Sequence, residues 1–312
     1  MVGEEEGSLS EPLLGGDVNN NDDDEGGSGQ AGGFDLLGII AEFFVNIFVS
    51  MGLCSRPPPP LTEAQKLRLA KLASRASVTY DPQVESHVNL LRQLWSLAFP
   101  NRSLPSLKCE EWKEMGWQGT DPATDFRSGG LMSLENLAWF AEHQPRVFQR
   151  LMHKRDGVRS QWEYPFAAAG VNITFQLVDV LELRDKTKKF GTSDSSSNDS
   201  GGGEGGRGGL LPIPAPTSPA GVAFVDCLMM EGDDDDDDDD KQKDDDDASF
   251  EKIYVAWFEV LDRNWLEAKA TYMEFSQVME KTKMEVMRAL ERAGRRRGGC
   301  TIAGFRQELG LQ

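Results

Sequence analysis

Residues 112–140 read WKEMGWQGTDPATDFRSGGLMSLENLAWF and combine several turn-forming residues with a Leu-rich segment. Glycines permit backbone conformations that other residues rarely adopt, and Pro122 directly after Asp121 favours a tight turn. We therefore expect an ordered loop here rather than a loose one. Ser133 is expected to cap the Leu-rich helix that follows.

The segments around this loop have the spacing of amphipathic or buried helices. Thr62 with Gln65 three residues later predicts a capping box at the start of one helix. Asp81 followed by Pro82 predicts the start of another, and Pro145 fits the first turn of a third. The predicted helical segments are 62–77, one from residue 81, one from 133, one from 145, 165–184 and 250–293. Since no segment shows the alternation typical of a strand, the sequence predicts an all-α fold.

Two segments are too polar to bury a core. Residues 1–33 carry nine acidic side chains and no basic one, and residues 191–249 are rich in Ser, Gly and Pro before a run of Asp. We expect the first to be a disordered acidic N-terminus and the second a long disordered acidic insert in a single helical domain, because loop-closure entropy rises only slowly with length. The domain then has a first part at 57–190, last helices at 250–293 and a C-terminal tail at 294–312.

Residues 1–33 contribute −9 and residues 233–247 contribute −10 to the formal net charge of −19, so the rest of the chain is neutral. A nucleic-acid binder needs an excess of Lys and Arg to neutralise phosphates, so we expect no nucleic-acid partner. The four cysteines and three histidines are too scattered for zinc-ligand spacing. We therefore expect no metal, no cofactor and a reducing compartment. The N-terminus lacks the basic and apolar regions of a secretory signal.

Residues 34–56 are expected to form an apolar helix, centred on LLGIIAEFFVNIFVSMGL at 36–53. Its polar residues recur at every fourth position and would share one narrow stripe of a helix: Gly38, Glu42, Asn46 and Ser50. This stripe favours a helix that docks on protein or lies at a membrane interface. A membrane-spanning helix is the alternative, because the length suffices.

The chain has no phosphate-binding loop ending in Gly-Lys-Ser/Thr, no nucleophile elbow and no HExxH motif. We therefore do not expect it to hydrolyse a nucleotide itself. Arg127, in the loop at 112–140, lies beside two glycines that would let the surface of a partner approach its guanidinium. Asp125, two residues earlier, is placed to orient it.

The stretch at 112–140 resembles the signature of the ELMO-domain family. The matching elements are, in order, Trp112, Gly116-Trp117-Gln118, Pro122-Ala123-Thr124-Asp125-Phe126-Arg127, a Gly-rich turn and a Leu-rich helix. The resemblance extends to YPFAAAGVNITFQL at 164–177 and to the last long helices, so it covers roughly residues 62–184 and 250–290. The chain is too short for the further domains of the large scaffold members and is similar to the short, stand-alone members.

Those short members are known as GTPase-activating proteins for Arf and Arf-like small GTPases. The resemblance implies the same activity here, an Arf-family GTPase as partner, and an activator rather than an enzyme with its own nucleotide site. It also implies a cytoplasmic protein with peripheral contact to an internal membrane through 36–53. By resemblance, Arg127 matches the arginine thought essential for activation, supplied in trans to the nucleotide. The loop-supporting residues would be Trp112, Gly116, Gln118, Pro122, Thr124, Asp125, Phe126 and Gly130.

The loop departs from the family pattern at two positions. Trp117 stands where the family usually has Phe, which is a mild change if the ring packs in the core. Ser128 stands where the family usually has Gly directly after the arginine. We expect strain at Ser128 if that position needs a positive φ, and a weakened activity as its consequence.

Two residues of the loop have a second interpretation. Arg127 is either the residue offered to the GTPase or a structural cation tied to Asp121 or Asp125. Gln118 either helps to place a water or, as we favour, satisfies buried loop backbone with its amide. If Arg127 is structural, the chain is a non-catalytic interaction or adaptor module that binds a small GTPase or an exchange factor.

Overall fold

The described part of the chain is helical throughout. The computed structural model describes four stretches, residues 59–154, 163–184, 215–229 and 248–311. They belong to one compact unit, Pro58–Gln312. No strand occurs in these stretches, which confirms the all-α prediction, and none of their helices is long and apolar enough to cross a membrane. The predictions made for 1–33 and 34–56 lie outside the described residues.

Helices of very different length succeed one another along the chain. The α-helices are α2 (Glu63–Ser77), α3 (Glu85–Ala98), α4 (Gly130–His143), α5 (Pro145–Met152), α6 (Phe166–Val180), α7 (Pro219–Met229), α8 (Ser249–Ala268), α9 (Phe275–Gly294) and α10 (Ile302–Glu308). In the described residues, three short 3₁₀ helices lie between them: η1 (Glu110–Met115), η2 (Pro122–Arg127) and η4 (Tyr272–Glu274). We call residues 110–130, from the start of η1 to the start of α4, the arginine loop. It contains η1 and η2 and carries Arg127.

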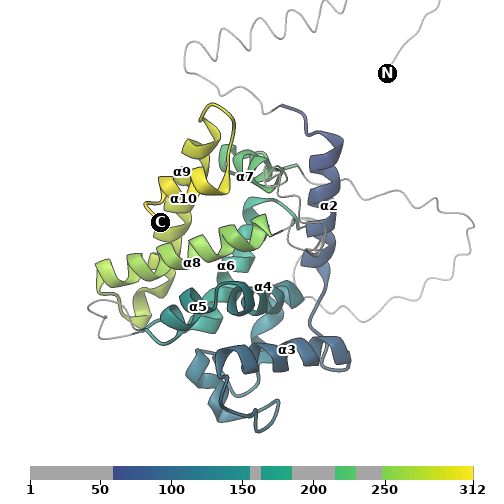
Figure 1. Ribbon diagram of the computed structural model, residues 1–312, viewed down its shortest axis with the longest axis vertical. Helices are drawn as coiled ribbons and strands as arrows, with labels where there is room; N and C mark the ends of the chain where they lie inside the picture. Colours follow the sequence, from purple (N-terminus) through teal and green to yellow (C-terminus); the bar gives the residue numbers. More distant parts are fainter. Residues whose placement is uncertain (1–58, 155–162, 185–214, 230–247, 312) are drawn as a thin grey trace, which may run out of the picture. The chain divides into compact units, whose positions relative to one another are not determined.

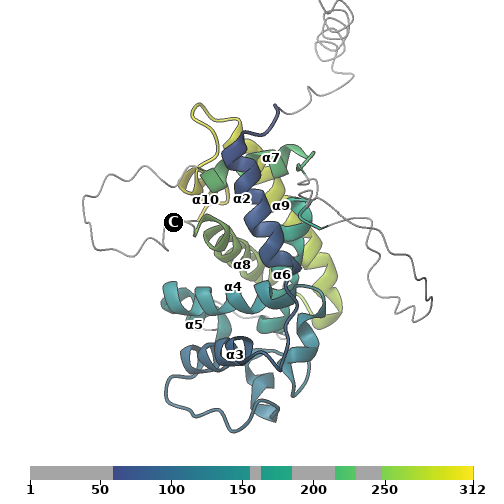
Figure 2. The same cartoon turned by 90° about the vertical axis from the view of Figure 1, so that its right-hand side faces the viewer.

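The helices pack in a succession that joins the part of the chain before the insert to the part after it. Helix α3 packs on α4, α4 on α6, α6 on α8, and α8 on α9 (Figure 1). Figure 2 shows α2 along one side of the unit, where it contacts α7 and α4. Helices that precede residue 184 therefore share one core with helices that follow residue 248.

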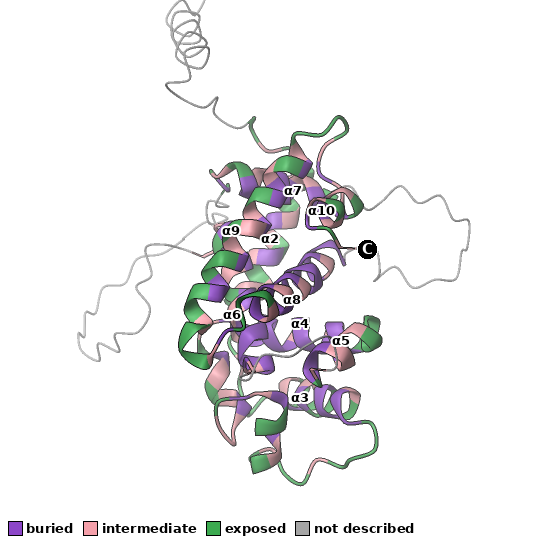
Figure 3. Ribbon diagram, turned by 90° about the vertical axis from the view of Figure 1, so that its left-hand side faces the viewer, coloured by how far each residue is buried: buried purple, intermediate pink, exposed green. Residues whose placement is uncertain are grey.

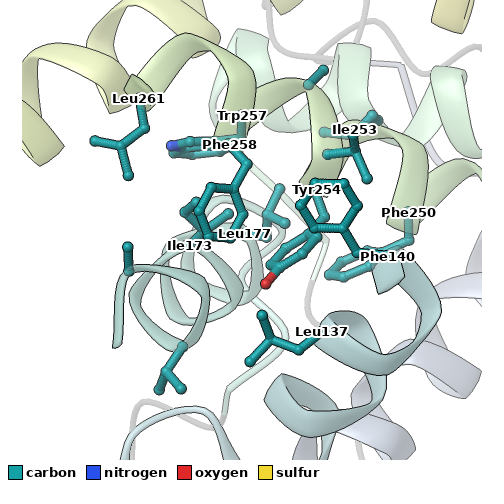
Figure 4. Close-up of a cluster of buried hydrophobic side chains, with 14 of the residues drawn as sticks. Leu137, Phe140, Ile173, Leu177, Phe250, Ile253, Tyr254, Trp257, Phe258 and Leu261 are labelled. Atoms are coloured by element: carbon teal, nitrogen blue, oxygen red, sulfur yellow. The ribbon is translucent and has the colours of Figure 1, made fainter. Parts of the chain in front are cut away.

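Aromatic side chains fill the centre of this core, where α4, α6 and α8 meet (Figure 4). The ring of Phe258 lies 5.6 Å from that of Phe140 and 4.7 Å from that of Phe166, measured between centroids. All three rings are buried. Rings of this size contribute the most apolar area per residue. Figure 3 shows the buried residues on the inward faces of the helices, as their periodic spacing predicts.

The helix starts test the capping predictions. The capping box of Thr62 and Gln65 is present, and Pro145 is the first residue of α5, so both predictions are confirmed. Helix α3 begins at Glu85, after the turn that Asp81 opens. The prediction that Ser133 caps α4 is wrong: the helix begins at Gly130, and Ser133 is fully buried inside it.

The insert predicted at 191–249 contains a folded helix, which corrects the expectation that this insert is disordered. Helix α7 packs against α9 and α2, and its residues Phe224 and Val225 are fully buried. The ring of Phe224 stacks on Phe250 at 5.9 Å. An eleven-residue apolar segment can join a core that the surrounding chain has already built, whereas its composition alone does not reveal that core. The rest of the insert lies outside the described residues.

The C-terminal part also differs from its prediction. Residues 294–312 were expected to form a tail, but α10 packs against α8 and α9, with Phe305 fully buried. The loop before α10 carries Cys300, which forms a disulfide with Cys227 of α7. The scattered cysteines led us to expect a reducing compartment, in which disulfides are rare, but the fold brings these two together across 73 positions.

Tyr254 on α8 places a polar atom in the apolar core. Its hydroxyl points into the cluster drawn in Figure 4 and has no hydrogen-bond partner among the described residues. Burial raises the pKa of this phenol well above its usual range. We expect Tyr254→Phe to raise the free energy of unfolding by about 1 kcal/mol, because it removes an unsatisfied buried hydroxyl and keeps the ring. Urea unfolding measures the change.

A matched tyrosine provides the control for this prediction. The hydroxyl of Tyr164 donates to Oδ1 of Asp262 at 2.9 Å. Tyr164→Phe should therefore lower the free energy of unfolding, by about 1–2 kcal/mol, since it leaves the carboxylate without that donor. A loss at Tyr254→Phe as large as that at Tyr164→Phe would contradict the assignment of an unsatisfied hydroxyl.

Candidate functional site

The arginine loop is docked on the start of α6 through Gly116. This residue ends η1 with φ +90°, and its carbonyl accepts a hydrogen bond from the N–H of Ala168 at 3.3 Å. A Cβ at this position would lie 2.3 Å from the main-chain nitrogen of Phe166. Only glycine allows both the left-handed conformation and this close approach of two backbones. The predicted supporting role of Gly116 thus has a geometric basis.

A ladder of aromatic rings holds the two 3₁₀ helices of the loop together. The ring centroids of Trp95 and Trp112 are 4.9 Å apart, those of Trp112 and Trp117 are 6.3 Å apart, and those of Trp117 and Phe126 are 5.3 Å apart. All four rings are buried. Tyr80 closes the ladder, 5.0 Å from Phe126. Trp117 therefore packs in the core as expected, and Phe126 fixes one face of η2 inside the protein.

The start of η2 is capped by Asp121. Its Oδ1 accepts from the N–H of Ala123 at 3.1 Å, and its Oδ2 pairs with Nζ of Lys108 at 2.7 Å. Pro122 is the first helical residue and is buried. The hydroxyl of Thr124 donates to the main-chain carbonyl of Asp121 at 2.8 Å. The turn expected from Asp121 and Pro122 is thus formed, and Thr124 supports it.

Asp125 ties η2 to the preceding turn instead of orienting Arg127. Its Oδ2 accepts from the main-chain N–H of Gln118 at 2.9 Å, and its Oδ1 accepts from the hydroxyl of Thr124 at 3.3 Å. The side chain of Gln118 is exposed, so our preferred role for its amide, satisfying buried backbone, is wrong. It is the backbone of Gln118 that takes part in the loop.

Arg127 is the last residue of η2, and its side chain is exposed. Over residues 59–154, 163–184, 215–229 and 248–311, its guanidinium has no ion pair and no hydrogen bond. The carboxylates of Asp121 and Asp125 are engaged by Lys108 and by the Gln118 N–H. Its neighbour Phe126 is only 3% exposed, so the backbone on the near side of Arg127 is anchored in the core.

The turn after Arg127 is unstrained at the position where strain was expected. Ser128 has φ −88° and ψ −35°, an ordinary helical conformation, so the condition for strain, a positive φ at this position, is not met. The positive φ of this turn, +62°, falls on Gly130. The next N–H, of Leu131, donates to the carbonyl of Val78 at 2.9 Å, and a Cβ on Gly130 would lie 2.5 Å from that oxygen. Gly130 supports the loop by letting α4 start against the α2–α3 connection.

We expect Ser128→Gly to weaken the protein slightly and not to raise any activity of the loop. Glycine adds conformational freedom to the unfolded chain without relieving strain here, so the free energy of unfolding should fall by about 0.5–1 kcal/mol. Urea unfolding of the two proteins measures the difference. A stabilised Ser128→Gly protein would show that the serine is strained after all.

One neighbour of the loop is not evident from the sequence. Arg184, just after α6, donates from Nη2 to the main-chain carbonyl of Ser128, 56 positions away. A bond to a main-chain oxygen requires no particular residue at the other end, so no sequence pattern signals it. In the described residues, no group of three or more His, Cys, Asp or Glu side chains is arranged to hold a metal ion.

Comparisons with known proteins agree with this loop and its helical frame. Residues 70–279 match the model of the ELMO/CED-12 family. ELMO domain-containing protein A of Dictyostelium discoideum is 30% identical over 227 residues, which cover 73% of this chain and 21% of that protein. ELMO domain-containing protein 1 of Mus musculus is 39% identical over 110 residues, or 30% of this chain and 34% of that protein.

A third relative is ELMO domain-containing protein 2 of Homo sapiens, which is 34% identical over 107 residues, covering 33% of this chain and 34% of that protein. The aligned regions thus span between about a fifth and a third of the length of these three relatives. The family model covers more than half of the chain and includes the arginine loop and helices on both sides of the insert. The chain belongs to the ELMO/CED-12 family.

Proposed function

We propose that this protein accelerates GTP hydrolysis by an Arf-family small GTPase and supplies Arg127 in trans to the bound nucleotide. The observation that carries the proposal is the exposed Arg127 guanidinium, which has no ion pair or hydrogen bond within the described residues. It stands on a loop whose backbone is held by the buried ring of Phe126 and by the bond between Asp125 and the Gln118 N–H. The relatives' names state only that they contain the ELMO domain, so the activity rests on this geometry and on the family resemblance.

The chemistry of GTP hydrolysis explains why a free guanidinium is useful. Negative charge spreads over the oxygens of the transferred phosphoryl group and over the leaving oxygen in the transition state. A planar, permanently charged guanidinium can donate two parallel hydrogen bonds to such oxygens, which a lysine ammonium cannot. An arginine supplied in trans contributes about 10³–10⁵ to the rate in known GTPase systems. Arg127 would fill this role.

The surrounding residues prepare Arg127 by restricting its backbone. Phe126 is buried in the aromatic ladder, and Asp125 bonds the backbone of Gln118. A side chain that projects from a fixed backbone loses less freedom on binding than one on a loose loop. The two 3₁₀ helices thus hold the backbone from which the exposed guanidinium of Arg127 projects.

The experiment is single-turnover GTP hydrolysis by a panel of Arf and Arf-like GTPases, with and without the full-length protein. We expect acceleration of at least one member that rises with protein concentration and saturates. The control is Arg146→Ala on α5, which removes another exposed arginine and should accelerate as well as the original protein. Saturable binding to a GTPase without acceleration would instead support the adaptor function.

The proposal includes a site of action at the cytoplasmic face of an internal membrane, with 36–53 as a peripheral contact. The support is the apolar composition of that segment and its narrow polar stripe. A protein lacking residues 1–56 should shift from the membrane to the soluble fraction on centrifugation of cell extracts. An unchanged distribution would rule out anchoring by this segment.

A further inference from the structure

The backbone directly after Arg127 is held by a second arginine. Arg184 donates from Nη2 to the carbonyl of Ser128, and its guanidinium carbon lies 4.3 Å from the ring centroid of Phe175 on α6. A cation over an aromatic face is attracted by the negative face of the ring. The guanidinium is thus held between one exposed ring of α6 and one carbonyl of the arginine loop.

The base of Arg184 is fixed by the end of α6. The two leucines before it, Leu181 and Leu183, are buried, and the N–H of Leu183 donates to the carbonyl of Val178 at 3.0 Å. Between them, the carboxylate of Glu182 accepts from both the N–H and the hydroxyl of Thr217, at 3.0 and 2.7 Å. Glu182 and Thr217 are thus bonded to each other, and Arg184 projects from an anchored backbone.

The Ser128 carbonyl is a sensitive place for such a contact. It lies at the C-terminal end of η2, where carbonyls lack partners within the helix. Without a donor to this carbonyl, the backbone between Arg127 and the start of α4 would lose one of the contacts that hold it. Partial burial lowers the pKa of Arg184, and the nearby charge of Asp179 opposes that shift. The guanidinium still keeps its positive charge at neutral pH, because arginine is not deprotonated in proteins.

We propose that Arg184 is a positioning residue for Arg127: by holding the Ser128 carbonyl and resting on Phe175, it keeps the end of η2 in the conformation from which Arg127 reaches the nucleotide. This inference rests on the proposed function of Arg127. If this backbone is already fixed, it need not be ordered in the transition state, and we expect this to be worth a factor of about ten in rate.

The kinetic test compares full-length variants in single-turnover GTP hydrolysis over a range of protein concentrations. Arg184→Ala should lower the saturating rate about ten-fold and leave the half-saturating concentration unchanged. In an Arg127→Ala background the same substitution should have no further effect, because there is no guanidinium left to position. Equal losses in both backgrounds would overturn the proposal.

The control substitutes an arginine with a similar bond elsewhere. Nη2 of Arg292 donates to the main-chain carbonyl of Glu308 at 3.1 Å, far from the loop in sequence and on α9. Arg292→Ala should leave the rate unchanged. If Arg184→Ala does not fold, Phe175→Ala serves in its place. This ring is 39% exposed, and its loss removes the platform of Arg184 and should lower the saturating rate in the same way.

Hydrogen–deuterium exchange tests the contact without any GTPase. Peptides that cover residues 118–130 should exchange faster in Arg184→Ala than in the original protein, and no faster in Arg292→Ala. Unchanged exchange in this loop would overturn the positioning role even if the activity of Arg127 is found. If Arg184→Ala exchanges faster but the original protein stimulates no GTPase, the proposed function is rejected, and with it the positioning role in catalysis. The bond from Arg184 to Ser128 would then be a structural contact only.

Discussion

Arg127→Ala is expected to lower the acceleration of GTP hydrolysis by at least about 10³-fold, because it removes the guanidinium offered to the transition state. The fold should be unaffected. The Arg127 side chain is exposed and has no bonded partner in the described parts of the chain, so the free energy of unfolding should change by less than about 0.5 kcal/mol. Single-turnover hydrolysis and urea unfolding of the same preparation measure the two quantities.

Two further variants make this result specific. Arg127→Lys keeps the positive charge and should still lose most of the acceleration, since an ammonium lacks the planar fork. Arg146→Ala removes an exposed charge from α5 and should retain full acceleration. An Arg127→Ala protein that melts much earlier than the original would point to a structural cation, and full acceleration by it would reject the proposed function.

Gly116→Ala is expected to cause the largest loss of stability among substitutions in the loop. The residue has φ +90°, and an added Cβ would lie 2.3 Å from the nitrogen of Phe166 and 2.8 Å from the carbonyl carbon of Pro165. Left-handed strain costs about 1–2 kcal/mol and overpacking against rigid backbone about 1–3 kcal/mol. We expect a loss of about 3 kcal/mol in the free energy of unfolding, measured in urea.

Gly119, three residues later in the same loop, is the matched control. A Cβ there would come no closer than 4.0 Å to the nearest atom, the nitrogen of Asp121. Gly119→Ala should therefore change the free energy of unfolding by less than about 0.5 kcal/mol. Equal effects at the two glycines would contradict the docking of Gly116 against the start of α6.

Local signals in the sequence predicted the helical frame well. The capping box at Thr62, the proline at the start of α5 and the periodic apolar residues of α6, α8 and α9 all depend on neighbours within a few positions. Such features act through the backbone of one segment and are therefore readable from that segment. The all-α class followed from them without any knowledge of packing.

The errors share a different origin, which is contact between distant segments. Ser133 has the residue type of an N-cap, but the helix starts four residues earlier than such a cap would allow, where Gly130 closely approaches Val78. The segment of α7 is surrounded by low-complexity sequence and folds because α9 and α2 offer it an apolar surface. The disulfide between Cys227 of α7 and Cys300, in the loop before α10, depends on the packing of α7 against α9.

The candidate site contains both features that local sequence predicts and features that depend on contacts between distant segments. The turn at Asp121 and Pro122 was predicted, because these residue types favour a tight turn, whereas Phe126 was named only by resemblance and its burial was not predicted. The strain expected at Ser128 did not occur, because the loop places its positive φ at Gly130 instead. The role of Arg184 depends on a main-chain oxygen and could not be anticipated from any pattern of side chains.

A complex with a transition-state mimic tests the role of Arg127 most directly. An Arf-family GTPase that the protein stimulates is loaded with GDP, and binding of the protein is measured with and without aluminium fluoride, which imitates the transferred phosphoryl group. Interactions made only in the transition state strengthen binding of such mimics selectively. We expect aluminium fluoride to tighten binding of the original protein and of Arg146→Ala, and to have no effect on Arg127→Ala. Equal tightening with Arg127→Ala would show that this guanidinium does not reach the nucleotide.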